Sequence, residues 1–460
     1  MPKVTITKLI NNLPYQIEIG DNHDHSGGEG KIFFSLDQCY AIKLYSKPAS
    51  DKKDLLEKVI ELGKNLGEDA KFLAWPLGIV ERLDTEDCLG CVTRKIPSSY
   101  VTLSKLIYTP KVAVEQIKQG RNWLDYLKIA RSIAAAIRTI HGKGIAHADL
   151  QWKNFLADIS TGEAVLIDLD GVVVNGFLPP QVQGVRGFIA PEVEMGLAKP
   201  SETTDRHSAT VLILWTLVFR NVMEAQGCYD EDENKDAILS YGKEACFSEN
   251  PSDRRNWKQN IGLPLIRNGS PSFRMLTPKL QELTENTLIK GLHNPSKRPQ
   301  VQEWERALAE AQDTLITCSN CEQSFIYPYW IQPQQRRHCP FCGTSVRSPW
   351  PVVLELLEPK AQGIYLPARS VILYHNQPLF ADVIEPFQLP PFNRDGLPIL
   401  GKTIWDAKKN VHLLINKNNT PWQVVTGGGS GLIKRGESVE LQRGLVLCFA
   451  ENKRLVRVVE

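Results

Sequence analysis

At 460 residues, with 42% hydrophobic and 23% charged residues, the chain has the composition of a soluble globular protein and the length for two to four domains. Its formal net charge of +2 gives no reason to expect binding to bulk nucleic acid or to an anionic membrane. The longest apolar run, Ala209–Phe219, is too short to cross a bilayer, and the N-terminal residues hold no apolar core of signal-peptide length. We therefore expect a cytoplasmic protein.

The N-terminal part of the chain contains predicted strands, then a glycine-rich turn and a strand that carries a lysine. Residues 4–20 alternate polar and apolar side chains, which predicts one or two strands. The turn from His25 to Ile32 contains three glycines, and the strand after it carries Lys43. Glycine lets backbone N–H groups approach phosphate oxygens closely, and a lysine on the adjacent strand can reach the same phosphates.

One helix and two strands are expected next. The pattern predicts a helix over Asp51–Leu66 and strands over Phe72–Val80 and Leu89–Ile96. Cys88 and Cys91 form a C-x-x-C pair with no second pair nearby, so they are interpreted as packed cysteines rather than metal ligands.

Four polar residues near the middle of the chain form a set that phosphoryl transfer requires. His147, Asp149 and Asn154 fit the pattern H-x-D-x-x-x-x-N, and Asp168 follows an apolar strand. In phosphoryl transfer one carboxylate orients the attacking hydroxyl, while an amide and a second carboxylate hold the magnesium ions that bridge the phosphates. A loop that carries Asp149 and Asn154 can aim both into one cleft, and a strand end can present Asp168 opposite them.

Residues 15–312 resemble a protein kinase in the order of their motifs: the glycine loop, Lys43, the H-x-D and Asn pattern, Asp168, Ala-Pro-Glu at 190–192, and a late Asp205 and Arg298. The resemblance implies a bilobal fold that binds ATP and magnesium. It also implies that Asp205 ties the catalytic loop and that Arg298 pairs with Glu192 to join two distant segments.

The resemblance assigns roles to individual residues. Asp149 is the implied catalytic carboxylate, Lys43 binds phosphates, Asn154 and Asp168 bind magnesium, and Lys153 could neutralise the γ-phosphate. The remaining positions implied to bind ATP are Gly27, Gly28, Gly30, Ile32, Ala41 and the hinge near Thr93–Ile96.

Kinases pair the strand lysine with a glutamate of the following helix. Glu57 and Glu61 are four residues apart and therefore share a face, so the sequence leaves both open, and we favour Glu57.

The chain departs from the kinase pattern at three places. His25 replaces the first glycine of the loop, Ala148 replaces the arginine before the catalytic aspartate, and Leu169-Asp170 follows Asp168 where kinases have Phe-Gly. Residues 171–189 contain no Ser, Thr or Tyr, and an alanine cannot bind a phosphate. We therefore hypothesise that activity does not depend on phosphorylation of this segment.

Four cysteines in the C-terminal third have the spacing of a zinc site. Cys318-x-x-Cys321 and Cys339-x-x-Cys342 can place four thiolates tetrahedrally around one ion, and a site with no open position is structural. The segment resembles a zinc ribbon. Basic and aromatic residues decorate its loop, and we expect them to contact protein rather than nucleic acid: Arg336, Arg337, Tyr327, Tyr329 and Trp330.

From Val352 onward, short apolar runs alternate with Pro, Gly and Asn turns, which predicts an all-β sandwich. Its end resembles the latter half of a forkhead-associated domain. The phosphopeptide-binding residues of that family have no clear match, so a docking domain is expected.

The overall prediction is an α+β multidomain protein, with a bilobal kinase fold, a zinc ribbon and an all-β domain. The expected domains are 1–97 (kinase N-lobe), 98–312 (kinase C-lobe), 313–350 (zinc ribbon) and 351–460 (all-β domain). The stretches HADLQWKN, LIDLDG and FIAPE resemble a bacterial kinase group linked to stress and tellurite-resistance operons. This resemblance implies two partners, a von Willebrand A-type protein and a metal-dependent Ser/Thr phosphatase.

The predicted function is ATP- and magnesium-dependent phosphorylation of Ser or Thr in partner proteins. One alternative is a pseudokinase scaffold, against which stand Lys43, Asp149, Asn154 and Asp168. A second alternative is a small-molecule kinase of the aminoglycoside or choline type, which normally lacks the Ala-Pro-Glu motif and the late Arg298.

Overall fold

The computed structural model describes residues 2–9, 15–26, 28–64, 66–174, 178, 184–332, 338–425, 431–451 and 453–460. The chain divides into two compact units, each assembled from separated stretches. The first unit comprises Met1–Arg121, Asp125–Gln259 and Glu282–Glu305. The second comprises Asn122–Leu124, Asn260–Gln281 and Arg306–Glu460. Among the described helices, none has the length and apolarity that crossing a membrane requires.

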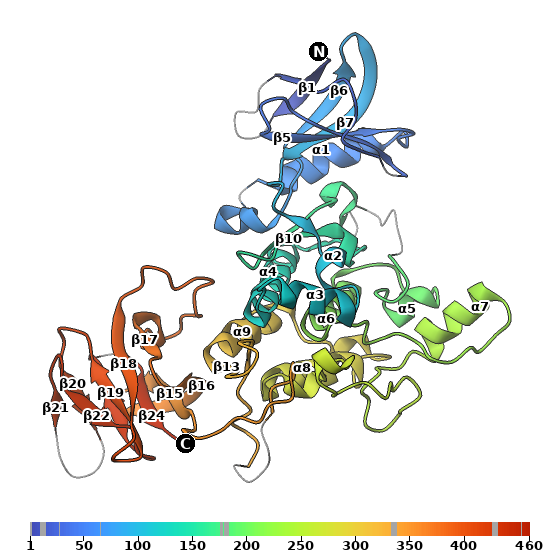
Figure 1. Ribbon diagram of the computed structural model, residues 1–460. Helices are drawn as coiled ribbons and strands as arrows, with labels where there is room; N and C mark the ends of the chain where they lie inside the picture. The colour runs from blue at the N-terminus through green and yellow to red at the C-terminus, as the bar shows by residue number, and fades with distance from the viewer. Residues whose placement is uncertain are drawn as a thin grey trace. The chain divides into compact units, whose positions relative to one another are not determined.

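A seven-stranded antiparallel sheet forms the N-terminal part of the first unit, in the order β2-β1-β6-β7-β5-β4-β3 (Figure 1). Its strands are β1 (Lys3–Leu9), β2 (Gln16–Glu18), β3 (His25–Ser26), β4 (Gly30–Phe34), β5 (Tyr40–Tyr45), β6 (Gly78–Leu83) and β7 (Glu86–Arg94). Alternating apolar residues of these strands form one core, which includes Val4, Ile42 and Val92.

Helix α1 (Lys52–Leu62) packs its apolar face on this sheet (Figure 1). Leu56 and Ile60 form a second core cluster with Ile79 of β6 and Cys91 of β7. The helix is shorter than the sequence predicts.

The strand predicted over Phe72–Val80 begins only at Gly78 in the structure. A 3₁₀ helix (Gly67–Phe72) and an extended stretch come before it. Pro76 lies in that stretch, and proline has no N–H to donate to a sheet.

The rest of the first unit is mainly helical. Its helices are α2 (Ser104–Ile107), α3 (Pro110–Lys118), α4 (Trp123–His141), α5 (Pro191–Glu194), α6 (Glu202–Val218) and α7 (Glu233–Ile238), and it shares α8 (Pro278–Leu288) and α9 (Val301–Ala311) with the second unit. Two small sheets, β11-β10-β8 and β12-β9, lie among them. Their strands are β8 (Val101–Thr102), β9 (Ile145–Ala146), β10 (Phe155–Asp158), β11 (Glu163–Leu166) and β12 (Val173–Val174). Helix α4 ends at His141, directly before Gly142.

The second unit contains a short hairpin and a two-sheet region. The hairpin pairs β13 (Leu315–Thr317) with β14 (Ser324–Ile326). A six-stranded sheet follows in the order β16-β15-β24-β23-β20-β21, with a four-stranded sheet in the order β17-β18-β19-β22. Their strands are β15 (Val352–Ala361), β16 (Ile364–Leu373), β17 (Pro378–Phe380), β18 (Ile399–Asp406), β19 (Val411–Asn416), β20 (Trp422–Val424), β21 (Leu432–Ile433), β22 (Ser438–Glu440), β23 (Val446–Cys448) and β24 (Leu455–Val458).

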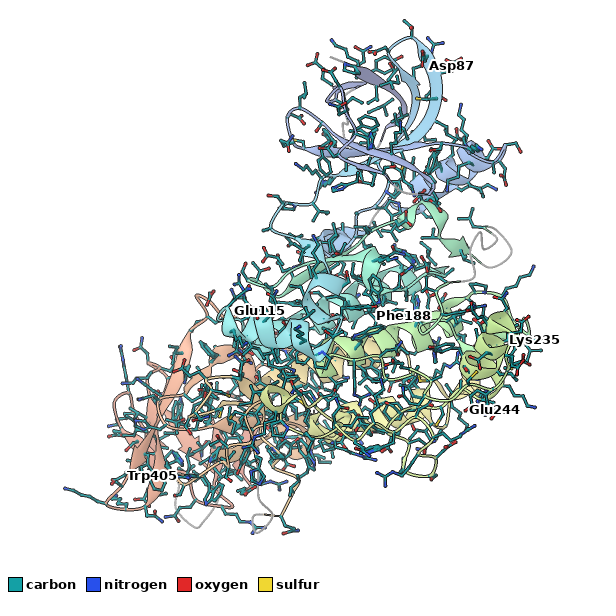
Figure 2. The ribbon with its side chains drawn as sticks, turned by 45° about the vertical axis from the view of Figure 1, so that its right-hand side comes forward. Asp87, Glu115, Phe188, Lys235, Glu244 and Trp405 are labelled. Atoms are coloured by element: carbon teal, nitrogen blue, oxygen red, sulfur yellow. The ribbon has the colours of Figure 1, made fainter. Side chains whose placement is uncertain are left out.

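Both sheets contribute side chains to one core, in which the rings of Trp422 and Phe449 lie 4.8 Å apart. On β18, Trp405 packs its ring 4.8 Å from that of His412 on β19 (Figure 2). The all-β region predicted from Val352 onward is therefore present in the structure.

Candidate functional site

A cavity of about 430 Å³ in the first unit adjoins the polar residues that the sequence singles out. Ile32, Ala41 and Lys43 line it from β4 and β5, and Asn154 and Asp168 line it from the loops beside β10 and β11. Its size falls within the range of small-molecule pockets in proteins.

The apolar walls of the cavity include Leu156, Ile167 and Leu169. Thr93, Arg94 and Ile96 of the predicted hinge also border it, as does His25 in place of the first glycine. An apolar cavity with cationic and acidic groups at one end can hold a molecule that is part aromatic and part phosphate.

Lys43 lies at the centre of the charged end of the cavity. Strand β5 pairs Lys43 with Ile32 on β4 and with Cys91 on β7, which fixes its position within the sheet. Its Nζ lies 2.7 Å from Asp168 Oδ1, and these two residues are separated by 125 positions in the chain. The structure thus brings together the lysine and the aspartate that the sequence predicts to converge.

Two further acids contact Lys43. Its Nζ lies 2.7 Å from Glu29 Oε2 and 3.2 Å from Asp170 Oδ2. Burial lowers the pKa of Lys43, but the carboxylates of Asp170 and Asp168 more than offset this, so the pKa lies above its usual value. Lys43 is therefore a permanent cation at this end of the cavity.

Asp149 and Asn154 form a hydrogen-bonded pair in the loop before β10. Asn154 Nδ2 donates to the Asp149 backbone oxygen at 2.8 Å and to Asp149 Oδ2 at 2.9 Å. Gln151 Nε2 donates to both carboxylate oxygens of Asp149, at 3.0 and 2.9 Å. Such contacts hold the carboxylate as an oriented acceptor, which is what positioning a hydroxyl requires.

Asp205, in the first turn of α6, holds the backbone of this loop. Its carboxylate accepts hydrogen bonds from His147 N at 2.7 Å and from Ala148 N at 3.1 Å. The ring of His147 lies 3.1 Å from the carbonyl oxygen of Ile167, just before Asp168. These contacts connect the Asp149 loop to the segment that carries Asp168, and Asp205 has the contacts that the sequence predicts for it.

Ala148 and Asp168 both adopt the left-handed backbone region, with φ values of 68° and 63°. Residues other than glycine rarely adopt this region, and strain of this kind gathers at functional sites. The methyl group of Ala148 packs with Ala146 and Val173 in a small apolar cluster. No charged side chain would be accommodated there at low cost.

Arg298 and Glu192 form the predicted pair between distant segments. Arg298 Nη1 lies 2.6 Å from Glu192 Oε1, and Nη2 lies 2.8 Å from Oε2. Arg298 also donates to three backbone oxygens, and its side chain has no exposed surface. The pair is structural, because it lies away from the residues that line the cavity.

Among the described residues, Lys43 forms ion pairs with Glu29, Asp168 and Asp170 and not with Glu57, the favoured partner. The buried residues of α1 are Lys52, Leu55, Leu56, Val59 and Ile60. At 100° per residue, Glu57 lies about 140° around the helix from Lys52, and Glu61 about 180°. The residue of α1 that reaches the site is the lysine.

Four residues of the site escaped the sequence prediction: Glu29, Tyr45, Lys52 and Asp170. A signal existed for Lys52, because it falls on the apolar stripe of the helix with Leu56 and Val59.

The other predicted residues differ in placement. Gly30 is required, because a Cβ there would lie 2.1 Å from the Leu44 carbonyl oxygen, whereas a Cβ at Gly28 would meet open space. Lys153 is exposed, and its Nζ lies over the Trp152 ring, 5.1 Å from the centroid, so the structure does not aim it at the cavity. Gly27 falls outside the described residues.

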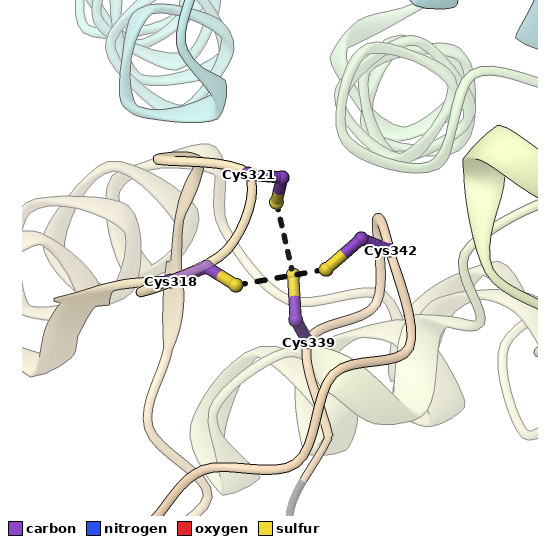
Figure 3. Close-up of side chains that lie close together, drawn as sticks. All are labelled: Cys318, Cys321, Cys339 and Cys342. Carbon is purple, nitrogen blue, oxygen red and sulfur yellow. Dashed lines mark hydrogen bonds between the residues drawn. The ribbon is translucent and has the colours of Figure 1, made fainter.

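The four predicted cysteines meet in the second unit, where their sulfur atoms point toward one another (Figure 3). Cys318 Sγ lies 3.6 Å from Cys342 Sγ, and Cys321 Sγ lies 3.7 Å from Cys339 Sγ. Four thiolates at about 2.3 Å from a central zinc ion would lie about 3.8 Å apart.

Burial raises the pKa of Cys342, but hydrogen bonds with Thr344 lower it to about 6, whereas burial raises the pKa values of Cys321 and Cys339. Zinc binding would therefore have to displace thiol protons from the cluster. The distances between the sulfur atoms fit a zinc ion. Arg336 and Arg337 of its loop fall outside the described residues.

The cavity with its lysine, acids and amide defines a site that can hold phosphate groups and a divalent cation.

No protein-family model matches the chain. The chain is 31% identical over 80 residues to a dual serine/threonine and tyrosine protein kinase of Apis mellifera, across 17% of this chain and 8% of that protein. It is 26% identical over 175 residues to the protein of the same name in Danio rerio, across 37% of this chain and 19% of that protein. The match thus covers only a small part of the length of each relative. The similarity indicates a distant relationship to protein kinases.

Proposed function

We propose that the protein is an ATP- and magnesium-dependent protein kinase that transfers the γ-phosphate to Ser or Thr hydroxyls of partner proteins. The observation that carries the proposal is the convergence of Lys43, Asn154 and Asp168 at one cavity, beside the oriented carboxylate of Asp149. The distant similarity to protein kinases supports the same reaction class.

Each residue has a chemical role in the proposal. Lys43 binds phosphate oxygens as a permanent cation, and the apolar cavity walls hold the base. Asp168 and Asn154 are the oxygen ligands available for magnesium, which when bound neutralises charge on the phosphates. Asp149 accepts a hydrogen bond from the substrate hydroxyl and then its proton, since its carboxylate is held by Gln151 and Asn154.

The reaction in this proposal does not require phosphorylation of residues 171–189. The segment holds no hydroxyl-bearing residue, and Ala148 lies in an apolar cluster where other kinases have a phosphate-binding arginine. Treatment of the purified protein with a phosphatase, followed by its removal, should leave the rate of transfer unchanged. A phosphosite mapped between Asp170 and Ala190 would contradict this part.

The decisive experiment compares the wild-type protein with Asp149→Ala, using labelled ATP, magnesium and a protein acceptor. The variant should lose about 10²–10⁴-fold in rate, the usual contribution of a positioned acid or base. Asp87→Ala is the matched control, because Asp87 is exposed on β7 (Figure 2) and does not line the cavity. It should transfer phosphate at the wild-type rate.

Three other outcomes would overturn the proposal. Equal activity of Asp149→Ala and wild type would remove Asp149 from the mechanism. Nucleotide binding without transfer to any acceptor would favour the scaffold alternative. Transfer to a small molecule such as an aminoglycoside or choline, and never to protein, would favour the small-molecule kinase.

The C-terminal regions have proposed roles in partner binding. We propose that Cys318, Cys321, Cys339 and Cys342 hold one structural zinc ion and that the β region, which resembles a forkhead-associated domain, docks protein. Beyond the substrate, the proposed partners are a von Willebrand A-type protein and a metal-dependent Ser/Thr phosphatase in the cytoplasm. The resemblance of the kinase motifs to those of stress and tellurite-resistance operons supports this choice.

A further inference from the structure

A buried carboxylate that the proposed mechanism does not use lies beside Lys43. Asp170 follows Asp168 by two positions, and its side chain is 5% exposed. Both of its carboxylate oxygens lie 3.2 Å from Lys43 Nζ. The hydroxyl of Tyr45, two residues after Lys43 on β5, donates to Asp170 Oδ2. Asp170 thus contacts the cation from one side while Asp168 contacts it from another.

Helix α1 contacts the same carboxylate through a lysine. Lys52 Nζ lies 3.3 Å from Asp170 Oδ2 and donates to the Asp170 backbone oxygen at 3.1 Å. The Lys52 side chain is 9% exposed, which is rare for lysine unless it is paired. The ammonium groups of Lys43 and Lys52 lie 5.4 and 4.9 Å from the centroid of the Tyr45 ring, close enough for a cation–π contribution.

Two cations and three carboxylates meet in this cluster. Lys43 and Lys52 face the carboxylates of Asp168 and Asp170, and the third carboxylate, that of Glu29, is 60% exposed to solvent. Burial raises the pKa of Asp170, but the ammonium groups of Lys43 and Lys52 more than offset this and lower it. A glutamate from α1 would add another negative charge and repel Asp170, so the helix supplies a cation where the kinase resemblance implies an acid.

We propose that Asp170, held by Lys52 and Tyr45, is the residue that positions Lys43 for the nucleotide phosphates, and that α1 acts on the site through the Lys52 cation. The inference rests on the proposed function and adds two positioning residues to it. The acid that steadies Lys43 comes from the loop after β11 rather than from the helix. Displacement of α1 would withdraw Lys52, leave Asp170 with one cation fewer and disturb Lys43.

The test measures kcat and KM for ATP in wild type, Lys52→Met, Lys52→Arg and Asp170→Asn, with thermal unfolding of each. Loss of a residue that orients a contact residue typically costs about 10–100-fold, so we expect Lys52→Met and Asp170→Asn to lose that much in kcat/KM for ATP. KM for the protein acceptor should stay unchanged. Lys52→Arg keeps the cation and should stay within about threefold of wild type.

Two controls separate positioning from stability. Leu56→Ala removes a buried side chain on the same face of α1 and should lower the midpoint of thermal unfolding, while the folded protein keeps its kcat/KM. Lys53→Met removes the neighbouring lysine, which is half exposed and pairs with Glu81, and should behave as wild type.

A double variant tests whether the two residues act as a unit. Lys52→Met combined with Asp170→Asn should lose no more activity than Asp170→Asn alone, because Lys52 acts through Asp170. Fully additive losses, or wild-type kinetics for Lys52→Met, would overturn the inference while leaving the proposed function intact. A wild-type protein that neither binds nor consumes ATP would overturn both.

Discussion

Two charged clusters in the first unit connect residues more than a hundred positions apart, and they differ in whether they border a cavity. The Glu192–Arg298 cluster joins residues 106 positions apart, and the Lys43–Asp168 contact joins residues 125 positions apart. Arg298 makes five hydrogen bonds, which equals the number of N–H donors in a guanidinium group. The Lys43 cluster instead borders a cavity, where the Asp168 side chain is 40% exposed.

This difference indicates that the Glu192–Arg298 cluster stabilises the fold, whereas the Lys43 cluster is placed to contact a ligand. Charge alone does not distinguish the two clusters, because both pair a cation with carboxylates. A cluster whose donors and acceptors are all used has nothing left to offer a ligand, whereas one that opens on a cavity can exchange partners when a ligand enters. Changes to the closed cluster should therefore cost stability, and changes to the open cluster should cost activity.

The four-cysteine cluster is a closed site that a metal ion would hold together, and its loss has the largest expected effect. Purified full-length protein should contain one zinc ion per chain, and a chelator should abolish the cooperative unfolding of the second unit, since structural zinc contributes on the order of 10 kcal/mol. Elemental analysis and calorimetry measure both. Cys339→Ser should act like the chelator, and Cys448→Ser, at a half-buried cysteine of the same unit, should not. A metal-free chain that unfolds unchanged would exclude the site.

Arg298→Met should cost about 3–5 kcal/mol of unfolding free energy, because it leaves the Glu192 carboxylate without its cation. Urea denaturation measures this loss. Arg82→Met is the control, since Arg82 is 61% exposed and its pairing with Asp87 should contribute at most about 1 kcal/mol. If both variants lost the same stability, or if folded Arg298→Met lost its activity, the distinction between closed and open clusters would fail.

The smallest expected effect is a pH dependence of stability caused by His207, a buried residue near the Arg298 cluster. It is 1% exposed, and burial, then the charges of Arg298 and His293, hold its pKa well below the usual value. The folded state keeps His207 neutral, while the unfolded state binds a proton below about pH 6.5. Stability should therefore fall as the pH drops below about 6.5, by about 1 kcal/mol by pH 5.5.

Urea denaturation of wild type and His207→Gln at pH 7.5 and 5.5 checks this. The variant should lose less stability over that interval, because the other titrating groups are common to both proteins. Identical pH dependence would show that His207 does not contribute.

Local spacing in the sequence is sufficient to predict only part of the candidate sites. Asp149 and Asn154 lie on one loop, and the four cysteines form two knuckles, so short-range geometry already constrains them. Lys43 and Asp168 are far apart in the chain, and only the order of several motifs points to their contact.

Lys52 and Asp170 were missed for a physical reason. The kinase resemblance implies an acid of the next helix as the partner of Lys43, whereas in the structure an acid from a loop pairs with Lys43 and a second lysine pairs with that acid. Charge complementarity among several groups depends on their positions in space, which periodicity alone does not give.

The division into two units was also beyond the sequence. The structure groups residues 260–281 with the cysteine cluster and the β region. Backbone hydrogen bonds make this association, from Leu265 N to the Pro340 oxygen at 3.1 Å and from Ile266 N to the Phe341 oxygen at 3.0 Å. Such bonds do not depend on side-chain type and leave no mark in the sequence.

The start of helix α4 has a consequence for how the chain is made on the ribosome. The backbone N of Trp123 donates to Gln323 Oε1 at 3.0 Å, and these residues are 200 positions apart. At about 5–20 residues per second, translation needs roughly 10–40 s to supply that partner. Until then the Trp123 N–H can only donate to water. The first turn of α4 therefore gains this hydrogen bond only after the segment with the first cysteine pair has been synthesised.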